Sequence, residues 1–130
     1  MIRALLGVFG GLALAMTMVF VLEGIGHQMY PPPADLDPTD REAFAAAVAA
    51  MPVMALVMVL IAYSLGTFAG AWLAARVGGR PFYAFLVGGV MTLAGMTNLI
   101  AVPHPLWFTI VGTLIFLPSA WVASRLAVYD

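Results

Sequence analysis

The sequence predicts an all-α integral membrane protein built as a four-helix bundle. Hydrophobic residues make up 64% of the chain and charged residues 8%, whereas a typical soluble domain carries about 25% charged residues. Residues 81–124 contain no Asp, Glu, Lys or Arg and are interrupted only by the turn Pro103-His104-Pro105. Since a charged group at the bilayer centre costs at least about 2.5 kcal/mol, this stretch indicates two membrane spans joined by a tight turn.

The first span is expected over residues 4–22, which carry no charge. A helix of that length measures about 28 Å and nearly matches a hydrocarbon core of about 30 Å. Ala13-Leu14-Ala15 resembles a signal-peptide cleavage site, but apolar sequence continues well beyond it. We therefore interpret the segment as a retained anchor.

An outer loop is expected over residues 28–42, where three consecutive prolines precede several acidic residues. Thr39 and Glu42 have the spacing of a capping box and predict the start of the second helix. The charge-free run 43–75 would be about 50 Å long as one helix, which exceeds the membrane thickness. The second helix, with its span over 46–75, is therefore expected to be long and to bend near Pro52.

The last two spans are expected over 82–102 and 106–124, which makes residues 1–130 a single transmembrane domain. With four spans, most arginines fall on the side of the termini: Arg3, Arg76, Arg80 and Arg125. Only Arg41 falls on the other side. The positive-inside rule then places both termini in the cytoplasm and predicts a multi-pass inner-membrane protein.

Small residues at helical spacing predict where the helices approach one another. The pairs that we expect at helix contacts are Gly7 with Gly11, Gly66 with Gly70, and Gly88 with Gly95 on the third span. Such contacts form either within one bundle or between copies. Besides the lipid bilayer, we therefore consider a second copy of the chain, in a homo-oligomer, or another membrane protein as a partner.

Four polar residues near the outer ends of the spans form a candidate polar or metal site: Glu23, His27, Asn98 and His104. Glu23 and His27 are four residues apart and share a face if they are helical. We expect the short turn after the third span to bring His104 toward them. An ionisable residue beside an apolar span needs a polar partner, and His27, Asn98 and His104 are the candidates for Glu23.

Three cofactors suit parts of this set. Glu23, His27 and His104 supply the ligand types of a catalytic zinc site. His27 with thioethers such as Met51, Met54 and Met96 suits copper(I), whereas a haem between two histidines fits worst because His104 lies between prolines. The alternative to all three is structural, with methionines as flexible packing and histidines at the membrane interface.

Other functions have little support in the sequence. It contains no phosphate-binding glycine loop and no HExxH or GxSxG motif, so an enzyme is not favoured. It has no basic cluster for nucleic acid and no cysteine. We therefore expect a small polytopic inner-membrane protein that acts through helix packing or subunit interaction. The alternative is a carrier or metal-binding membrane protein with an outward-facing Glu/His site.

Overall fold

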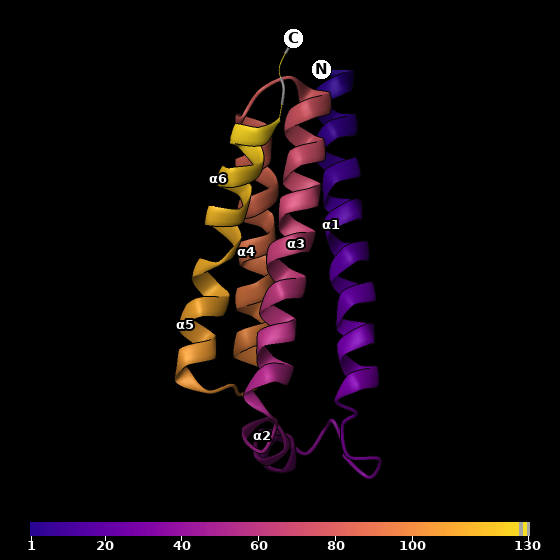
Figure 1. Cartoon of the computed structure of the whole chain (residues 1–130), viewed down its shortest axis with the longest axis vertical. Helices are drawn as coiled ribbons and strands as arrows, with labels where there is room; N and C mark the ends of the chain where they lie inside the picture. Colours follow the sequence, from indigo (N-terminus) through magenta and orange to yellow (C-terminus); the bar gives the residue numbers. More distant parts are fainter. Residues whose placement is uncertain (128, 130) are drawn as a thin grey trace.

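The chain folds into a bundle of long apolar helices. The computed structural model describes residues 1–127 and 129, and the regular elements among them are all helical. Four helical stretches are long and apolar enough to cross a membrane: α1 (Ile2–Met29), α3 (Val53–Gly78), α4 (Phe82–Ala101), and Leu106–Leu126, which comprises α5 (Leu106–Leu114) and α6 (Phe116–Leu126). They lie side by side, with both termini at one end of the bundle and the short helix α2 (Arg41–Ala49) at the other (Figure 1). The all-helical class is thus confirmed. Below, these ends are called the termini end and the α2 end.

α1 is longer than the span expected over residues 4–22. It continues through Glu23 to Met29 and ends where the Tyr30 N–H donates to the Gly26 carbonyl at 2.8 Å. The three prolines that follow prevent further helical hydrogen bonding. Glu23 therefore lies inside the helix and not at its end, because a single carboxylate does not terminate a helix.

The second helix differs from the expected long, bent one. The chain forms two separate helices, α2 and α3, with a break over Ala50, Met51 and Pro52. Pro52 has no N–H to donate and disfavours a helical conformation at Met51, so the chain stops and restarts there. α2 lies across the end of the bundle (Figure 1). Its N-cap is Asp40, whose side chain accepts from the Ala43 N–H at 3.1 Å, so the expected cap at Thr39 is wrong.

The helical stretch expected over 106–124 is also interrupted. α5 ends at Leu114 and α6 begins at Phe116, with Ile115 between them. Pro118 explains the break, because it cannot donate to the Leu114 carbonyl and its ring crowds that group. The break lets the last span change direction and bring Phe116 into the core, where its exposure is 1%.

α1 packs mainly on α3 through the predicted glycines. A Cβ placed on Gly7 would lie 2.9 Å from the Ala74 carbonyl oxygen, and one on Gly11 would collide with the Gly70 carbonyl. A Cβ on Gly66 would meet Val19 at 2.6 Å. These contacts extend from the termini end to the middle of the two helices and hold their backbones together.

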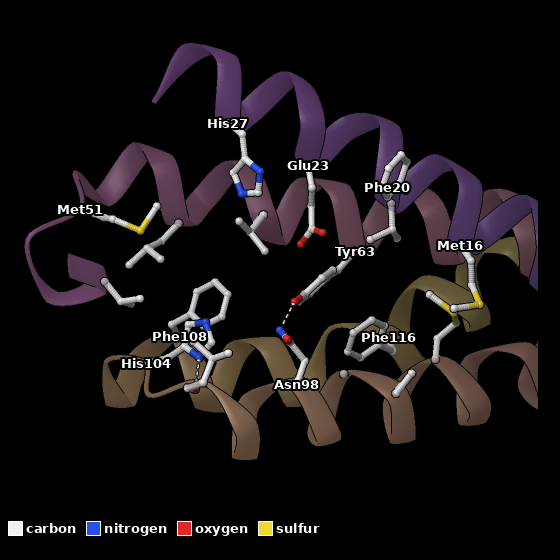
Figure 2. Close-up of a pocket in the computed structure, with 18 of the residues that line it drawn as sticks. Met16, Phe20, Glu23, His27, Met51, Tyr63, Asn98, His104, Phe108 and Phe116 are labelled. Atoms are coloured by element: carbon white, nitrogen blue, oxygen red, sulfur yellow. Dashed lines mark hydrogen bonds between the residues drawn. The ribbon is translucent and has the colours of Figure 1, made fainter. Parts of the chain in front are cut away.

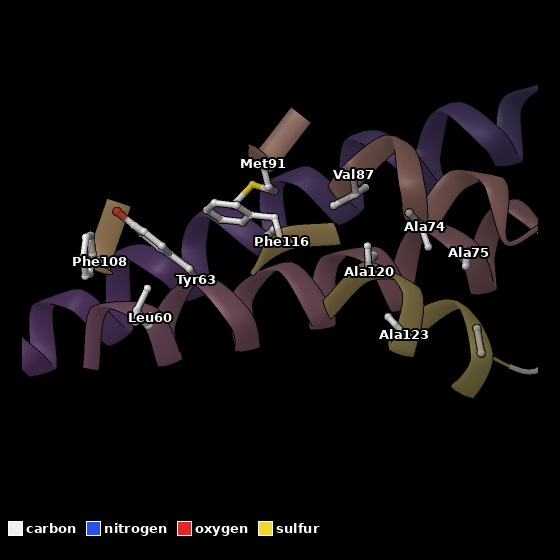
Figure 3. Close-up of a cluster of buried hydrophobic side chains, with 14 of the residues drawn as sticks. Leu60, Tyr63, Ala74, Ala75, Val87, Met91, Phe108, Phe116, Ala120 and Ala123 are labelled. Atoms are coloured by element: carbon white, nitrogen blue, oxygen red, sulfur yellow. The ribbon is translucent and has the colours of Figure 1, made fainter. Parts of the chain in front are cut away.

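The core lies between α3, α4 and the last span (Figure 3). Gly88 and Gly95 let α6 approach α4, because a Cβ on Gly88 would lie 2.6 Å from the Ala120 methyl group. A Cβ on Gly95 would lie 2.5 Å from the Phe116 ring. The contacts of the six predicted glycines are therefore all found within one chain.

Candidate functional site

A cavity of about 410 Å³ opens between the helices toward the α2 end, and the four predicted site residues all line it. Glu23 and His27 come from α1, Asn98 from α4, and His104 from the connection between α4 and α5. Figure 2 shows these side chains around the same space. Residues from three separate parts of the chain are thus brought together, as the polar-site interpretation requires.

Glu23 is half-buried on the cavity face of α1. His27, one helical turn further, interacts electrostatically with its carboxylate. Within residues 1–127 and 129, no N–H or O–H group donates a hydrogen bond to that carboxylate and no Lys or Arg pairs with it. A half-buried carboxylate without such partners would be stabilised by a bound cation or hydrogen-bond donor.

Tyr63 of α3 is a further residue of the site, which the sequence pattern did not predict. Its side chain is 5% exposed, and its hydroxyl accepts a 3.0 Å hydrogen bond from the Asn98 amide nitrogen. The ring packs against Phe116 with centroids 5.2 Å apart. A buried tyrosine needs a partner for its hydroxyl. Asn98, a polar residue on a neighbouring span, is the sequence signal from which this pairing could have been predicted. The Tyr63 hydroxyl points toward Asn98, and the two side chains are joined by the dashed line in Figure 2.

His104 is fixed in one orientation by its neighbours. Its Nδ1 lies 2.7 Å from the Val102 carbonyl oxygen, and its ring stacks on Phe108 with centroids 4.7 Å apart. Because a carbonyl only accepts, Nδ1 carries the proton in this bond. Burial lowers the pKa of His104 below its ordinary value, while the Val102 hydrogen bond acts in the opposite direction. The favoured neutral ring therefore keeps Nε2 as a hydrogen-bond acceptor.

The remaining walls of the cavity are apolar. Met16 and Phe20 line it on α1, and Met91 lines it on α4. Met51 and two α2 residues line it at the α2 end. Along α1 the lining runs from Met16 to His27, which corresponds to about 16 Å of helix. The polar side chains of the cavity thus lie toward the α2 end, and the lining nearer the middle of the helices is apolar.

The metal interpretations find no support in this geometry. Among the residues that the structure describes, no three His, Cys, Asp or Glu side chains form a group that could hold a metal ion. Glu23, His27 and His104 therefore share a cavity without forming the expected zinc site. The copper(I) set is dispersed as well, because Met54 and Met96 are 55% and 40% exposed and lie outside the cavity lining.

The fold and the cavity together define an all-helical protein with four helices long and apolar enough to cross a membrane and with an amphipathic pocket between them. No family model, curated protein or solved structure matches the chain. Its function is therefore inferred from its own residues, in particular from those that line the pocket.

Proposed function

We propose that the chain is a multi-pass inner-membrane protein of the carrier or binding class, with an outward-facing cavity that takes a small amphiphilic molecule. The observation that carries this proposal is that Glu23 and His27 of α1 line one cavity with Asn98 and His104, which lie more than 70 residues further along the chain. An ionisable residue within a membrane-spanning helix is costly and usually serves a substrate or ion pathway. Helix packing alone gives no reason for this convergence.

The dimensions of the cavity support a small-molecule ligand. Its volume of about 410 Å³ lies within the range of about 300–1,000 Å³ that is usual for ligand pockets. Its polar end can hold a headgroup while Met16, Phe20 and Met91 surround an apolar body. An amphiphile likewise has a polar headgroup at one end and an apolar body along the rest of its length.

The packing of α1 supports entry from the lipid. α1 has its main interface with α3 and only a small one with α4. Two cavity residues on α1, Met16 and Phe20, are 59% and 79% exposed, which places them at an opening on the lipid-facing surface. A ligand dissolved in the bilayer would enter between α1 and α4.

The orientation follows from the arginines. Arg3, Arg76, Arg80 and Arg125 belong to the termini end, and only Arg41 lies at the α2 end. By the positive-inside rule the termini end faces the cytoplasm, so the polar part of the cavity faces outward.

A second candidate function is action through helix packing or subunit interaction, with a homo-oligomer or another membrane protein as partner. Its support is the abundance of small residues in the spans. The six glycines from which it was inferred pack within one chain. An additional partner would therefore use other apolar surface, which makes this function the weaker of the two.

Cysteine labelling tests the proposed cavity, because the native chain has no cysteine. Ala94 lines the cavity and Ala34 lies exposed in the loop before α2. Ala94→Cys and Ala34→Cys variants in lipid nanodiscs are reacted with N-ethylmaleimide, with decyltrimethylammonium, decyl sulfonate or decanol added. At least one probe should slow labelling of Ala94→Cys roughly tenfold and leave Ala34→Cys unchanged. Equal labelling with and without every probe would overturn the proposal.

A further inference from the structure

The charges of the cavity indicate which class of amphiphile it takes. Building on the proposed function, we propose that the ligand is a cationic amphiphile. Its ammonium headgroup lies against Glu23, and its apolar body extends between α1 and α4.

Glu23 is the only Asp or Glu among the described residues that line the cavity, and no Lys or Arg is among them. The other titratable groups that line it are His27, Tyr63 and His104, while α2, α5 and α6 contribute apolar side chains. When ionised, Glu23 is the only negatively charged side chain among the described residues that line the cavity. A cationic headgroup would compensate this charge, whereas an anionic one would be repelled.

Arg41, the arginine at the α2 end, does not compensate the charge. Arg41 at the start of α2 donates to the Ile100 carbonyl at 3.5 Å. It lines a separate small hollow with Pro38 and Pro103, and it is not part of the cavity lining. Its guanidinium is therefore directed to the α4 backbone, and Glu23 remains open to a ligand cation.

The neutral polar groups of the cavity also suit a positive headgroup. His104 donates through Nδ1 to Val102, so Nε2 is its acceptor. Asn98 uses its amide nitrogen on Tyr63, which leaves its carbonyl oxygen as a second acceptor. An ammonium group that carries N–H bonds donates to such acceptors, and a quaternary one is attracted by their partial negative charge.

Aromatic rings provide the remaining part of a cation site. Tyr63 and Phe108 line the cavity beside the polar residues, and Phe20 lines it from α1. The faces of aromatic rings attract cations, and the attraction increases where water is excluded. A bare metal ion needs several oxygen, nitrogen or sulfur ligands at short range, and no such acidic or histidine group is present in the described part of the chain. An organic cation needs only one countercharge and apolar walls.

The labelling experiment distinguishes charge selectivity from binding itself. The three decyl probes share an alkyl chain and differ in headgroup charge. Decyltrimethylammonium should protect Ala94→Cys at a concentration roughly tenfold lower than decyl sulfonate or decanol. Adding Glu23→Gln should remove this preference. Adding Glu42→Gln, which removes a carboxylate from the exposed first turn of α2, should leave it unchanged.

The outcomes separate the two proposals. Equal protection by the three probes, unaffected by Glu23→Gln, would overturn the cation inference and leave the amphiphile-binding function intact. Protection by none of them would overturn both. The comparison of probes in the Ala94→Cys protein alone already tests charge preference, so the inference remains testable if Glu23→Gln fails to fold.

Discussion

The Asn98 amide donates a 3.0 Å hydrogen bond to the Tyr63 hydroxyl and thereby joins α4 to α3 beside the cavity. Polar contacts of this kind between membrane helices contribute about 0.6 kcal/mol on average. We predict a coupling energy of about that size in a double-mutant cycle of Tyr63→Phe and Asn98→Leu. The free energy of unfolding in bicelles is the quantity to measure. Strictly additive effects of the two substitutions would contradict the hydrogen bond.

Gly70→Ala should destabilise the bundle, because the added methyl group would meet the Gly11 backbone and the Ala15 side chain. Overpacking of this kind costs about 1–3 kcal/mol. Gly89→Ala is the matched control, since a Cβ there has no neighbour within 4 Å. It should be neutral or stabilising through helix propensity. Equal destabilisation of both variants in the same unfolding assay would refute the close α1–α3 packing.

His104 should make stability depend on pH in a known direction. Burial lowers the pKa of His104 below its ordinary value of 6.5, so the unfolded chain binds a proton more readily than the folded one. The stabilising contribution is complete above about pH 6.5 and is lost as the pH falls through the lower folded-state value. His104→Asn keeps a donor for the Val102 carbonyl but does not titrate.

The corresponding measurement compares the wild type with His104→Asn from about pH 7.5 to about pH 5. The wild type should lose stability relative to the variant as the pH falls. A difference that is constant over this range, or that shifts in favour of the wild type, would contradict the assignment of a neutral, half-buried His104.

Zinc or copper should not bind stoichiometrically to the purified protein. The described residues contain no group of three His, Cys, Asp or Glu side chains that could hold an ion, and catalytic zinc normally uses three protein ligands. Metal analysis of untagged protein, with and without added zinc or copper(I), checks this expectation. One equivalent of metal in the wild type that is lost in both His27→Ala and His104→Ala would contradict it.

Much of the architecture was predictable because the membrane constrains it strongly. Charge-free stretches such as residues 81–124 have few alternatives to apolar helices, and the positions of the four long apolar helices followed from them. The ends and breaks of the helices were harder to predict from the sequence. Glu23 was taken as the end of a span although α1 continues past it, and the interruption before Pro118 was not foreseen. A charge marks a boundary of apolar sequence, whereas backbone hydrogen bonding sets the end of the helix.

The site was predictable only in part. The polar residues Glu23, His27, Asn98 and His104 were conspicuous in an apolar sequence, and the structure places them around one cavity. The zinc and copper ligand sets inferred from them are not assembled in the structure. The types of side chain in a sequence do not reveal the distances between side chains on different helices. Tyr63 was not predicted because a single tyrosine in a span can have many roles. Its role as the hydrogen-bond acceptor of Asn98 depends on where α4 places Asn98 relative to α3.

Methionine methyl NMR of the protein in nanodiscs would test most directly whether an amphiphile occupies the cavity. Met16, Met51 and Met91 line it, whereas Met54 and Met96 lie outside its lining. Titration with decyltrimethylammonium should shift the first three methyl resonances in a saturable manner and leave the other two unchanged. Equal, non-saturating shifts of all five would show that the probe only dissolves in the lipid and would contradict a ligand-binding cavity.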